Sequence, residues 1–191
     1  KEPMIRLTAI WRAFGAQGQA VAGPAGATTR ALLRNRGAGP EMAQTVLSAG
    51  SGFNFYRPNY QPPGALRSRG LYAPELQILN EATALSTYNH LHSRLYQMDR
   101  DDLTIPATVT DPRFYTARMR LNLSAEKGLA VSPGALADRL NLLLMAGRMT
   151  PAMRQILVDA AYSTSMYDGG GDRVEDMIFL IASSPQFAGQ R

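Results

Sequence analysis

The two histidines, His90 and His92, stand two positions apart in a segment that is predicted to be helical. Residues i and i+2 of a helix point to different faces, so both rings could ligate one metal ion only if the helix were broken there. We therefore predict that this pair is not a metal site.

A second candidate for metal binding is the loop in which Asp168 and Asp172 bracket three glycines. Carboxylates and loop carbonyls could hold calcium, although the EF-hand spacing is absent. A flexible connector in which Asp172 is the N-cap of the next helix explains the same residues, and we favour that interpretation. The acidic turn with Asp99, Asp101 and Asp102 is interpreted in the same way, as solvated surface.

The sequence carries no nucleophile elbow, no P-loop and no zinc signature. It contains no cysteine, which excludes disulfides, thiolate metal ligands and a cysteine nucleophile in this segment. Neither histidine stands in a recognisable catalytic context. The catalytic residues, if the protein has any, are therefore unknown, and no cofactor is expected.

The loop from Phe53 to Tyr60 is the best candidate for binding. It combines Phe55, Tyr56 and Tyr60 with Arg57, and aromatic faces beside an arginine can stack on sugar rings or bind anionic groups. The simpler interpretation, which we favour, is a structural lid whose aromatic rings cover the core. Either way, we expect the residues to be ordered.

Helical spacing of apolar residues and strong helix starts predict most of the elements that must position these side chains. Ser132-Pro133 and Thr150-Pro151 are good N-cap and N1 pairs, and Gly147 is placed to end the first of these helices. Helices are expected at about 3–14, 29–35, 41–47, 73–96, 113–120, 132–147 and 150–160, with a last one after 172.

The intervening segments are predicted to be loops. Residues 15–29 are rich in glycine and alanine and indicate a mobile loop. Residues 50–72 contain Pro58, Pro62 and Pro63, which exclude a regular helix and predict an ordered loop laid over the helices. The expected fold is mainly α: an irregular helical array with a long ordered aromatic and Pro-rich loop and a C-terminal three-helix segment at 132–187.

Composition limits the class of protein. A chain of 191 residues with 45% apolar residues can build one core, and no apolar run is long enough to cross a bilayer. Residues 1–72 carry nine basic and two acidic side chains, so this half could face an anion or an acidic neighbour. The basic residues are spread out and only two are lysines, which argues against nucleic acid.

Several segments resemble, in order, the C-terminal portion of a bacterial family known as domain of unknown function 1800. They cover nearly the whole chain and are Lys1-Glu2-Pro3 with Trp11-Arg12-Ala13-Phe14-Gly15, Phe53-Asn54-Phe55-Tyr56-Arg57-Pro58 with Pro62-Pro63-Gly64, Gly70-Leu71-Tyr72-Ala73-Pro74-Glu75-Leu76, Leu144-Met145-Ala146-Gly147-Arg148-Met149-Thr150-Pro151, and Ser183-Ser184-Pro185-Gln186-Phe187. We accordingly expect residues 1–191 to be the C-terminal portion of a larger helical domain whose N-terminal part is missing.

The resemblance implies an exported bacterial protein, periplasmic, at the cell surface or secreted, that has a sulfatase-like protein as a possible partner. It adds Glu75 and Asn80, at the start of the long helix, to the polar candidates. Two hypotheses follow. One is an interaction or assembly module that contacts such a partner or the missing part of its own chain. The other is part of an enzyme acting on polysaccharide or sulfate esters, with catalytic residues partly outside this segment and a deep pocket at Tyr56 and Glu75.

Overall fold

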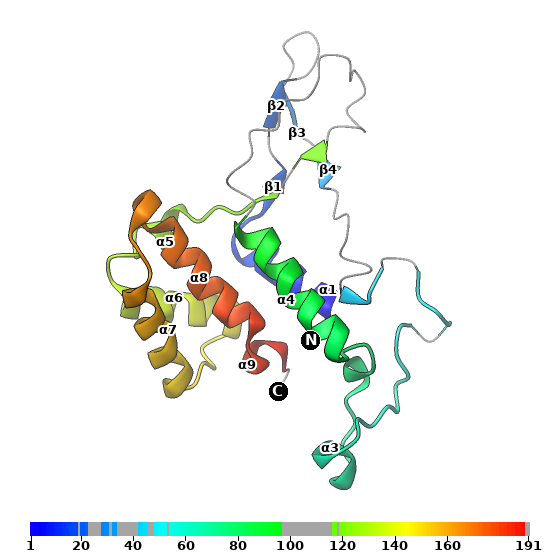
Figure 1. Cartoon of the computed structure of the whole chain (residues 1–191). Helices are drawn as coiled ribbons and strands as arrows, with labels where there is room; N and C mark the ends of the chain where they lie inside the picture. Colours follow the sequence, from blue (N-terminus) through cyan, green and yellow to red (C-terminus); the bar gives the residue numbers. More distant parts are fainter. Residues whose placement is uncertain are drawn as a thin grey trace.

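The computed structural model describes residues 1–18, 20–22, 28–30, 32–33, 42–45, 48–52, 54–96, 116–117 and 119–189. The fold is mainly α, as predicted (Figure 1). Its helices are α1 Pro3–Ala13, α3 Ala65–Ser68, the 3-10 helix η2 Pro74–Gln77, α4 Glu81–Tyr96, α5 Ser124–Lys127, α6 Pro133–Met145, α7 Pro151–Ser163, the 3-10 helix η4 Tyr167–Gly170, α8 Gly171–Ser183 and α9 Pro185–Ala188.

The core is built around α8. Val174, Met177, Ile178 and Ile181 recur at helical spacing on this helix, and all four are fully buried. Helix α8 packs against α4 on one side and against α6 and α7 on the other, so it joins the C-terminal helices to the N-terminal half of the chain. Helix α1 completes the core with Leu7 and Ile10.

The C-terminal helices begin and end where the sequence predicts. Thr150 caps α7, since its hydroxyl accepts a hydrogen bond from the Met153 backbone N–H at 3.3 Å, and Pro151 follows at N1. Helix α6 ends as Ala146 and Gly147 turn into the left-handed region. One detail differs from the prediction: the N-cap residue of α8 is Gly170, and Asp172 lies in the first turn of the helix.

The predicted helix over 73–96 is in fact two elements, η2 and α4. Asn80 and Thr83 break it by forming reciprocal bonds: the Asn80 side-chain oxygen accepts from the Thr83 N–H at 2.9 Å, and the Thr83 hydroxyl accepts from the Asn80 N–H at 2.8 Å. This pairing is a capping box, which starts a new helix and explains why the earlier turn does not continue into it.

The predictions at 15–29, 29–35 and 113–120 were wrong where the structure describes these residues, because short strands occur there. They are β1 Gln17–Gly18, β2 Ala20–Ala22, β3 Thr28–Arg30, β4 Leu32–Leu33, β5 Thr116–Ala117 and β6 Met119–Arg120. Pairs β1 with β6 and β2 with β3 are antiparallel, whereas β4 with β5 is parallel. Two of these pairs join segments that are far apart in the chain, as in Gln17 with Arg120 and Leu32 with Thr116, and such long-range pairing leaves no local signal in the sequence.

Of the described residues of the helix expected at 41–47, only Met42 is helical. Ala43 has a φ of 52°, in the left-handed region that a right-handed helix cannot include. Residues 97–115, which hold the acidic turn and the beginning of the expected helix at 113–120, lie outside the described residues.

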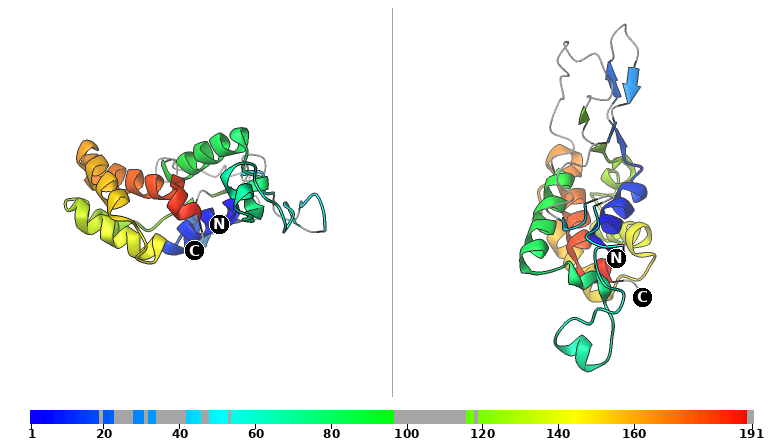
Figure 2. Two further views of the ribbon diagram at one scale, coloured as in Figure 1. Left: turned by 90° about the horizontal axis from the view of Figure 1, so that it is seen from below. Right: turned by 90° about the vertical axis from the view of Figure 1, so that its right-hand side faces the viewer.

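The Pro-rich segment leaves the helices and returns, rather than lying over them. We call residues 57–72 the arm. Figure 2 shows it extending beyond the helical body with α3 near its tip, at the end opposite the short strands. Its return is fixed at the base, where the Ala73 N–H donates to the Tyr60 carbonyl at 3.1 Å. Within the described part of the chain, no helix is long and apolar enough to span a bilayer.

The turn that leads into α8 generates the first prediction. Gly170 has a φ of 87°, and a Cβ atom there would lie 2.4 Å from the Cβ of Ala130. Substitution Gly170→Ala should destabilise the fold by about 2 to 4 kcal/mol, combining backbone strain with overpacking. Neighbouring Gly169 also has a positive φ, 61°, but open space around it, so Gly169→Ala should cost only about 1 kcal/mol. Urea denaturation of both variants checks the ranking, and equal losses would contradict it.

Candidate functional site

The base of the aromatic loop is bonded to the beginning of α1 through Glu2, the N-cap residue of that helix. The Tyr56 hydroxyl donates to one carboxylate oxygen of Glu2, and the Gln44 side-chain amide donates to the other. The Gln44 oxygen in turn accepts from the Met4 backbone N–H at 3.0 Å. A carboxylate at a helix N-terminus is also favoured by the helix dipole. Glu2 therefore joins three segments that are distant in sequence.

This network changes the acidity of Tyr56. Partial burial raises the pKa of the phenol, and the hydrogen bond to Glu2 and the negative charges of Glu2 and Glu75 raise it further. The phenol thus remains a neutral donor over the whole physiological range. This favours a structural role for Tyr56, in keeping with the lid interpretation, and it makes a catalytic base of this side chain implausible.

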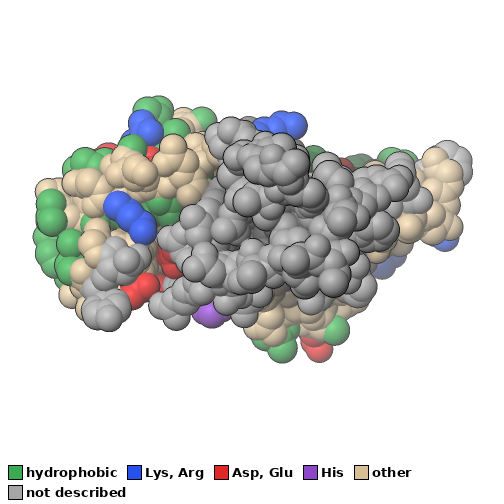
Figure 3. Space-filling model, turned by 90° about the horizontal axis from the view of Figure 1, so that it is seen from above, with side chains coloured by type: hydrophobic (Ala, Val, Ile, Leu, Met, Phe, Trp, Pro, Cys, Tyr) green, Lys and Arg blue, Asp and Glu red, His purple; other side chains and the backbone are tan. Residues whose placement is uncertain are grey.

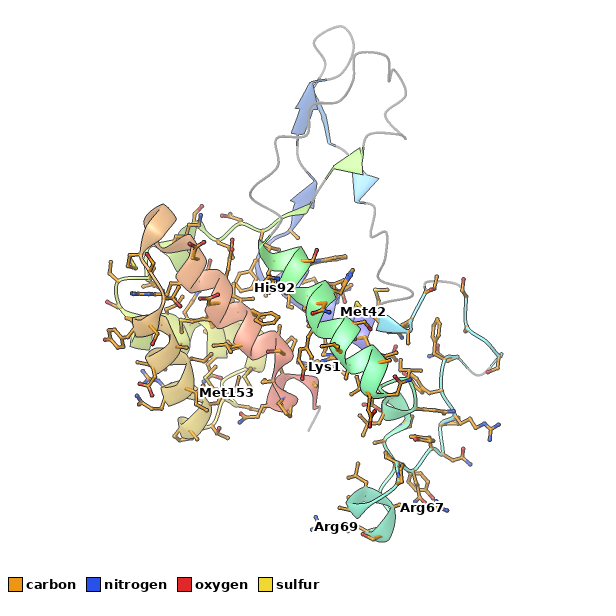
Figure 4. The ribbon with its side chains drawn as sticks, in the orientation of Figure 1. Lys1, Met42, Arg67, Arg69, His92 and Met153 are labelled. Atoms are coloured by element: carbon orange, nitrogen blue, oxygen red, sulfur yellow. The ribbon has the colours of Figure 1, made fainter. Side chains whose placement is uncertain are left out.

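Beside the network lies a pocket of about 460 Å³ between α1, the segment from Tyr72 to α4, and the chain around α9. Glu75 lines it and forms an ion pair with the α-ammonium group of Lys1 at 3.7 Å. Leu76 and Leu79 supply apolar wall, and Tyr88 donates to the Ser183 carbonyl at 3.2 Å on the opposite side. In Figure 4, Lys1 lies between the ribbons of α4 and α9.

A second pocket, of about 680 Å³, adjoins the first through Lys1. Its lining includes Arg148 and Phe187, and the Lys1 ammonium stands 3.9 Å from the centre of the Phe187 ring. Burial lowers the pKa of the Lys1 side chain, and the positive charges of Arg148 and Arg6 lower it further. The edge of the molecule where α1 meets α9 is therefore locally cationic.

The binding residues predicted from the sequence lie in different places in the structure and make different contacts. Phe55, Tyr56 and Tyr60 are partly buried near the base of the loop, and Arg57 is exposed. The Arg57 backbone N–H donates to the Gln77 side chain at 2.8 Å, which ties the loop to η2. Glu75 lines this pocket, whereas Tyr56 is not among its described lining residues, and the single pocket expected at both residues stays a prediction. Asn80 caps α4 as described above.

The predictions for metal sites are partly open to test. His90 is buried and His92 is exposed, so they lie on different faces of α4 as expected. The rings of His92 and Phe179 pack edge to face, with their centroids 5.5 Å apart. Among the described residues, no group of three or more metal-ligating side chains gathers in one place. The side chain of Asp168 lies outside the described part, so the pair of Asp168 and Asp172 stays a prediction.

Sequence reasoning missed two polar residues that line the first pocket, Arg6 and Thr87. Both are almost fully buried. A signal was present for Arg6, because Pro3, Arg6, Leu7 and Ile10 follow the i, i+3, i+4, i+7 pattern of the buried stripe of α1. An arginine at a stripe position is unusual, and it marks a place where the core must accommodate a charge.

The described basic side chains do not form one continuous surface on the face seen in Figure 3, where the Lys and Arg side chains stand apart from each other. Comparison with known proteins gives one match: the model of a family described as "Protein of unknown function (DUF1800)" matches residues 1–189. No curated protein and no solved structure matches the chain.

The bond between Tyr56 and Glu2 generates the second prediction. Tyr56→Phe should destabilise the fold by about 1 kcal/mol, as expected for a partly exposed hydrogen bond to a charged group. Tyr60→Phe is the matched control and should change stability little. Since the folded-state pKa of Tyr56 is raised, its contribution is complete below the ordinary tyrosine pKa of about 10 and is lost as the pH rises through the higher folded-state value.

Chemical denaturation of the wild type and both variants at pH 7 and at pH 10 to 12 measures this effect. The difference between wild type and Tyr56→Phe should shrink at the higher pH. A difference that grows with pH, or an equal loss in Tyr60→Phe, would show that the hydroxyl of Tyr56 does not bind Glu2 as described.

Proposed function

The chain belongs to the family of proteins of unknown function DUF1800, and we propose that it acts as an interaction module that binds a partner protein through the arm. The observation that supports this proposal is the surface of the arm. Arg57, Arg67 and Arg69 are exposed, and Leu71 and Tyr72 are 48% and 63% exposed although both are large and apolar. Arginine and aromatic side chains together are typical of the centres of protein interfaces.

The shape of the arm supports the same function. Figure 4 places Arg67 on α3 and Arg69, its C-cap residue, away from the helical body. A segment that covered the core would direct its apolar side chains inward, but none of the residues of α3 is buried. The base of the arm is nevertheless bonded to η2 and to the beginning of α1. An arm with a fixed base and an uncovered tip can present a surface with little loss of conformational entropy on binding.

The proposal includes a location and a type of partner, which rest on the family resemblance and not on geometry. We propose a periplasmic, cell-surface or secreted protein of bacteria whose partner is the sulfatase-like protein that the resemblance implies. The partner surface should be acidic with an apolar recess, to complement the arginines and Leu71 of the arm.

An enzyme acting on polysaccharide or sulfate esters is the second candidate. The observation in its favour is the pocket at Glu75, since a concave site with a carboxylate is a common feature of hydrolases. In the described lining of that pocket, however, Glu75 is paired with Lys1 and no histidine is present. The binding function therefore has the stronger support.

The third prediction tests the arm. The triple variant Arg67→Ala, Arg69→Ala, Leu71→Ser should bind the purified sulfatase-like protein of the same organism at least tenfold more weakly than the wild type. Biolayer interferometry measures both dissociation constants. None of the three side chains is buried, so the Tm should stay close to that of the wild type.

The matched control removes exposed apolar residues from a different surface. Leu142 on α6 and Ile156 on α7 are 66% and 61% exposed. The double variant Leu142→Ser, Ile156→Ser should bind with unchanged affinity. If the control variant loses binding and the arm variant keeps it, the interface lies on α6 and α7 and the proposed function of the arm is wrong.

A further inference from the structure

Among the described residues two arginines are almost fully buried, Arg6 and Arg173, and they differ in how their charge is accommodated. Arg173 on α8 donates to the Ala130 carbonyl at 2.8 Å and to the Thr164 carbonyl at 3.0 Å. Arg6 on α1 is 6% exposed, and its buried Nε has no hydrogen-bond partner among the described residues. A buried charge normally has such partners, because losing water without replacing it is strongly unfavourable.

The charge of Arg6 is not removed by a change of ionisation. Burial lowers the pKa of its guanidinium and Tyr88 only partly offsets this, but an arginine keeps its proton at neutral pH. The acidic residue in the pocket lining, Glu75, forms its ion pair with Lys1. Among the described residues no carboxylate forms an ion pair with Arg6, which brings a positive charge to the wall of the 460 Å³ pocket.

A second polar group in the same wall also lacks a partner. Thr87 on α4 is 2% exposed, and its buried hydroxyl has no hydrogen-bond partner among the described residues. A threonine within a helix usually bonds its hydroxyl to a carbonyl of the preceding turn, so an unpaired one is unusual. Arg6 and Thr87 come from different helices and line one pocket, so together they offer donors from two sides.

We infer that the pocket between α1 and α4 binds the oxyanion group of a small organic anion, with the Arg6 guanidinium and the Thr87 hydroxyl as its donors. A planar guanidinium matches the two oxygens of a carboxylate, sulfate or phosphate group. The remaining lining, with Leu76, Leu79 and Ala84, suits an apolar body attached to that group. The cationic neighbourhood of Lys1 favours negative charge further. Tyr72 of the arm also lines this pocket, but neither of the two proposed donors belongs to the arm.

Four probes of similar size identify the chemistry: phenyl sulfate, phenyl phosphate, benzoate and neutral benzyl alcohol, each titrated into the protein by isothermal calorimetry at constant ionic strength. At least one anion should bind saturably with one site per chain, and benzyl alcohol should bind at least tenfold more weakly. The order of the three anions shows which oxyanion the pocket prefers. If no anion binds saturably, or if benzyl alcohol binds as well as the best anion, the inference is wrong.

Variants locate the binding. Arg6→Gln should weaken the best anion at least tenfold, whereas Arg67→Gln, a matched change on the arm, should leave its affinity unchanged. Thr87→Val keeps the side-chain shape and should weaken binding severalfold, which provides a test that does not depend on Arg6→Gln folding. Unchanged affinity in both Arg6→Gln and Thr87→Val would overturn the assignment of these donors.

Stability separates ligand binding from a structural role. No described residue forms an ion pair with Arg6 and its Nε is unbonded there, so Arg6→Met should keep or raise the Tm of the ligand-free protein. Arg173→Met removes the donor of the Ala130 and Thr164 carbonyls, so it should clearly lower the Tm. A large loss of Tm in Arg6→Met, comparable to that in Arg173→Met, would show that Arg6 stabilises the fold itself and would contradict the inference.

Discussion

The packing of α8 is the constraint on which the other described elements depend. This helix touches α4, α5, α6, α7 and α9, and its residues Val174, Met177, Ile178 and Ile181 are fully buried between them. Its polar positions are also used, because Arg173 bonds the carbonyls of Ala130 and Thr164 and so fixes the two chain segments that flank α6 and α7. Burial of several large aliphatic side chains on one helix contributes on the order of 1.5 to 3 kcal/mol per side chain, which is more than any surface ion pair supplies.

Both candidate binding surfaces are consequences of that arrangement. Helix α8 packs against α4 on one side and is followed by α9. The space between α4, α9 and α1 is the pocket that Arg6 and Thr87 line. The arm begins and ends beside the same space, since Tyr56 bonds Glu2 and Ala73 lines the pocket. The helical body thus positions the arm and the pocket, which are the two parts proposed to contact other molecules.

The sequence predicted best the elements whose signals are local. Both Ser132-Pro133 and Thr150-Pro151 mark helix starts, through the proline at N1 in each and, at Thr150, a side-chain cap that the Ser132 side chain does not form. It predicted least well what depends on distant partners, such as the short strands that join residues 17–33 to 116–120. The break at Asn80 was missed because the capping box there is Asn with Thr, a weaker signal than Ser with Glu. For the site, the sequence indicated Glu75 but treated Arg6 as part of a core helix, since the absence of a partner for a buried charge is visible only in three dimensions.

The central claim is that the arm, held at its base by the helical body, is the surface that a partner protein covers. Hydrogen exchange measured by mass spectrometry, on the protein alone and in complex with the sulfatase-like protein, tests it most directly. The account predicts slower exchange in residues 64–72 on complex formation and unchanged exchange on the exposed faces of α6 and α7. A complex that forms with no protection of the arm, and with protection of α6 and α7 instead, would contradict it.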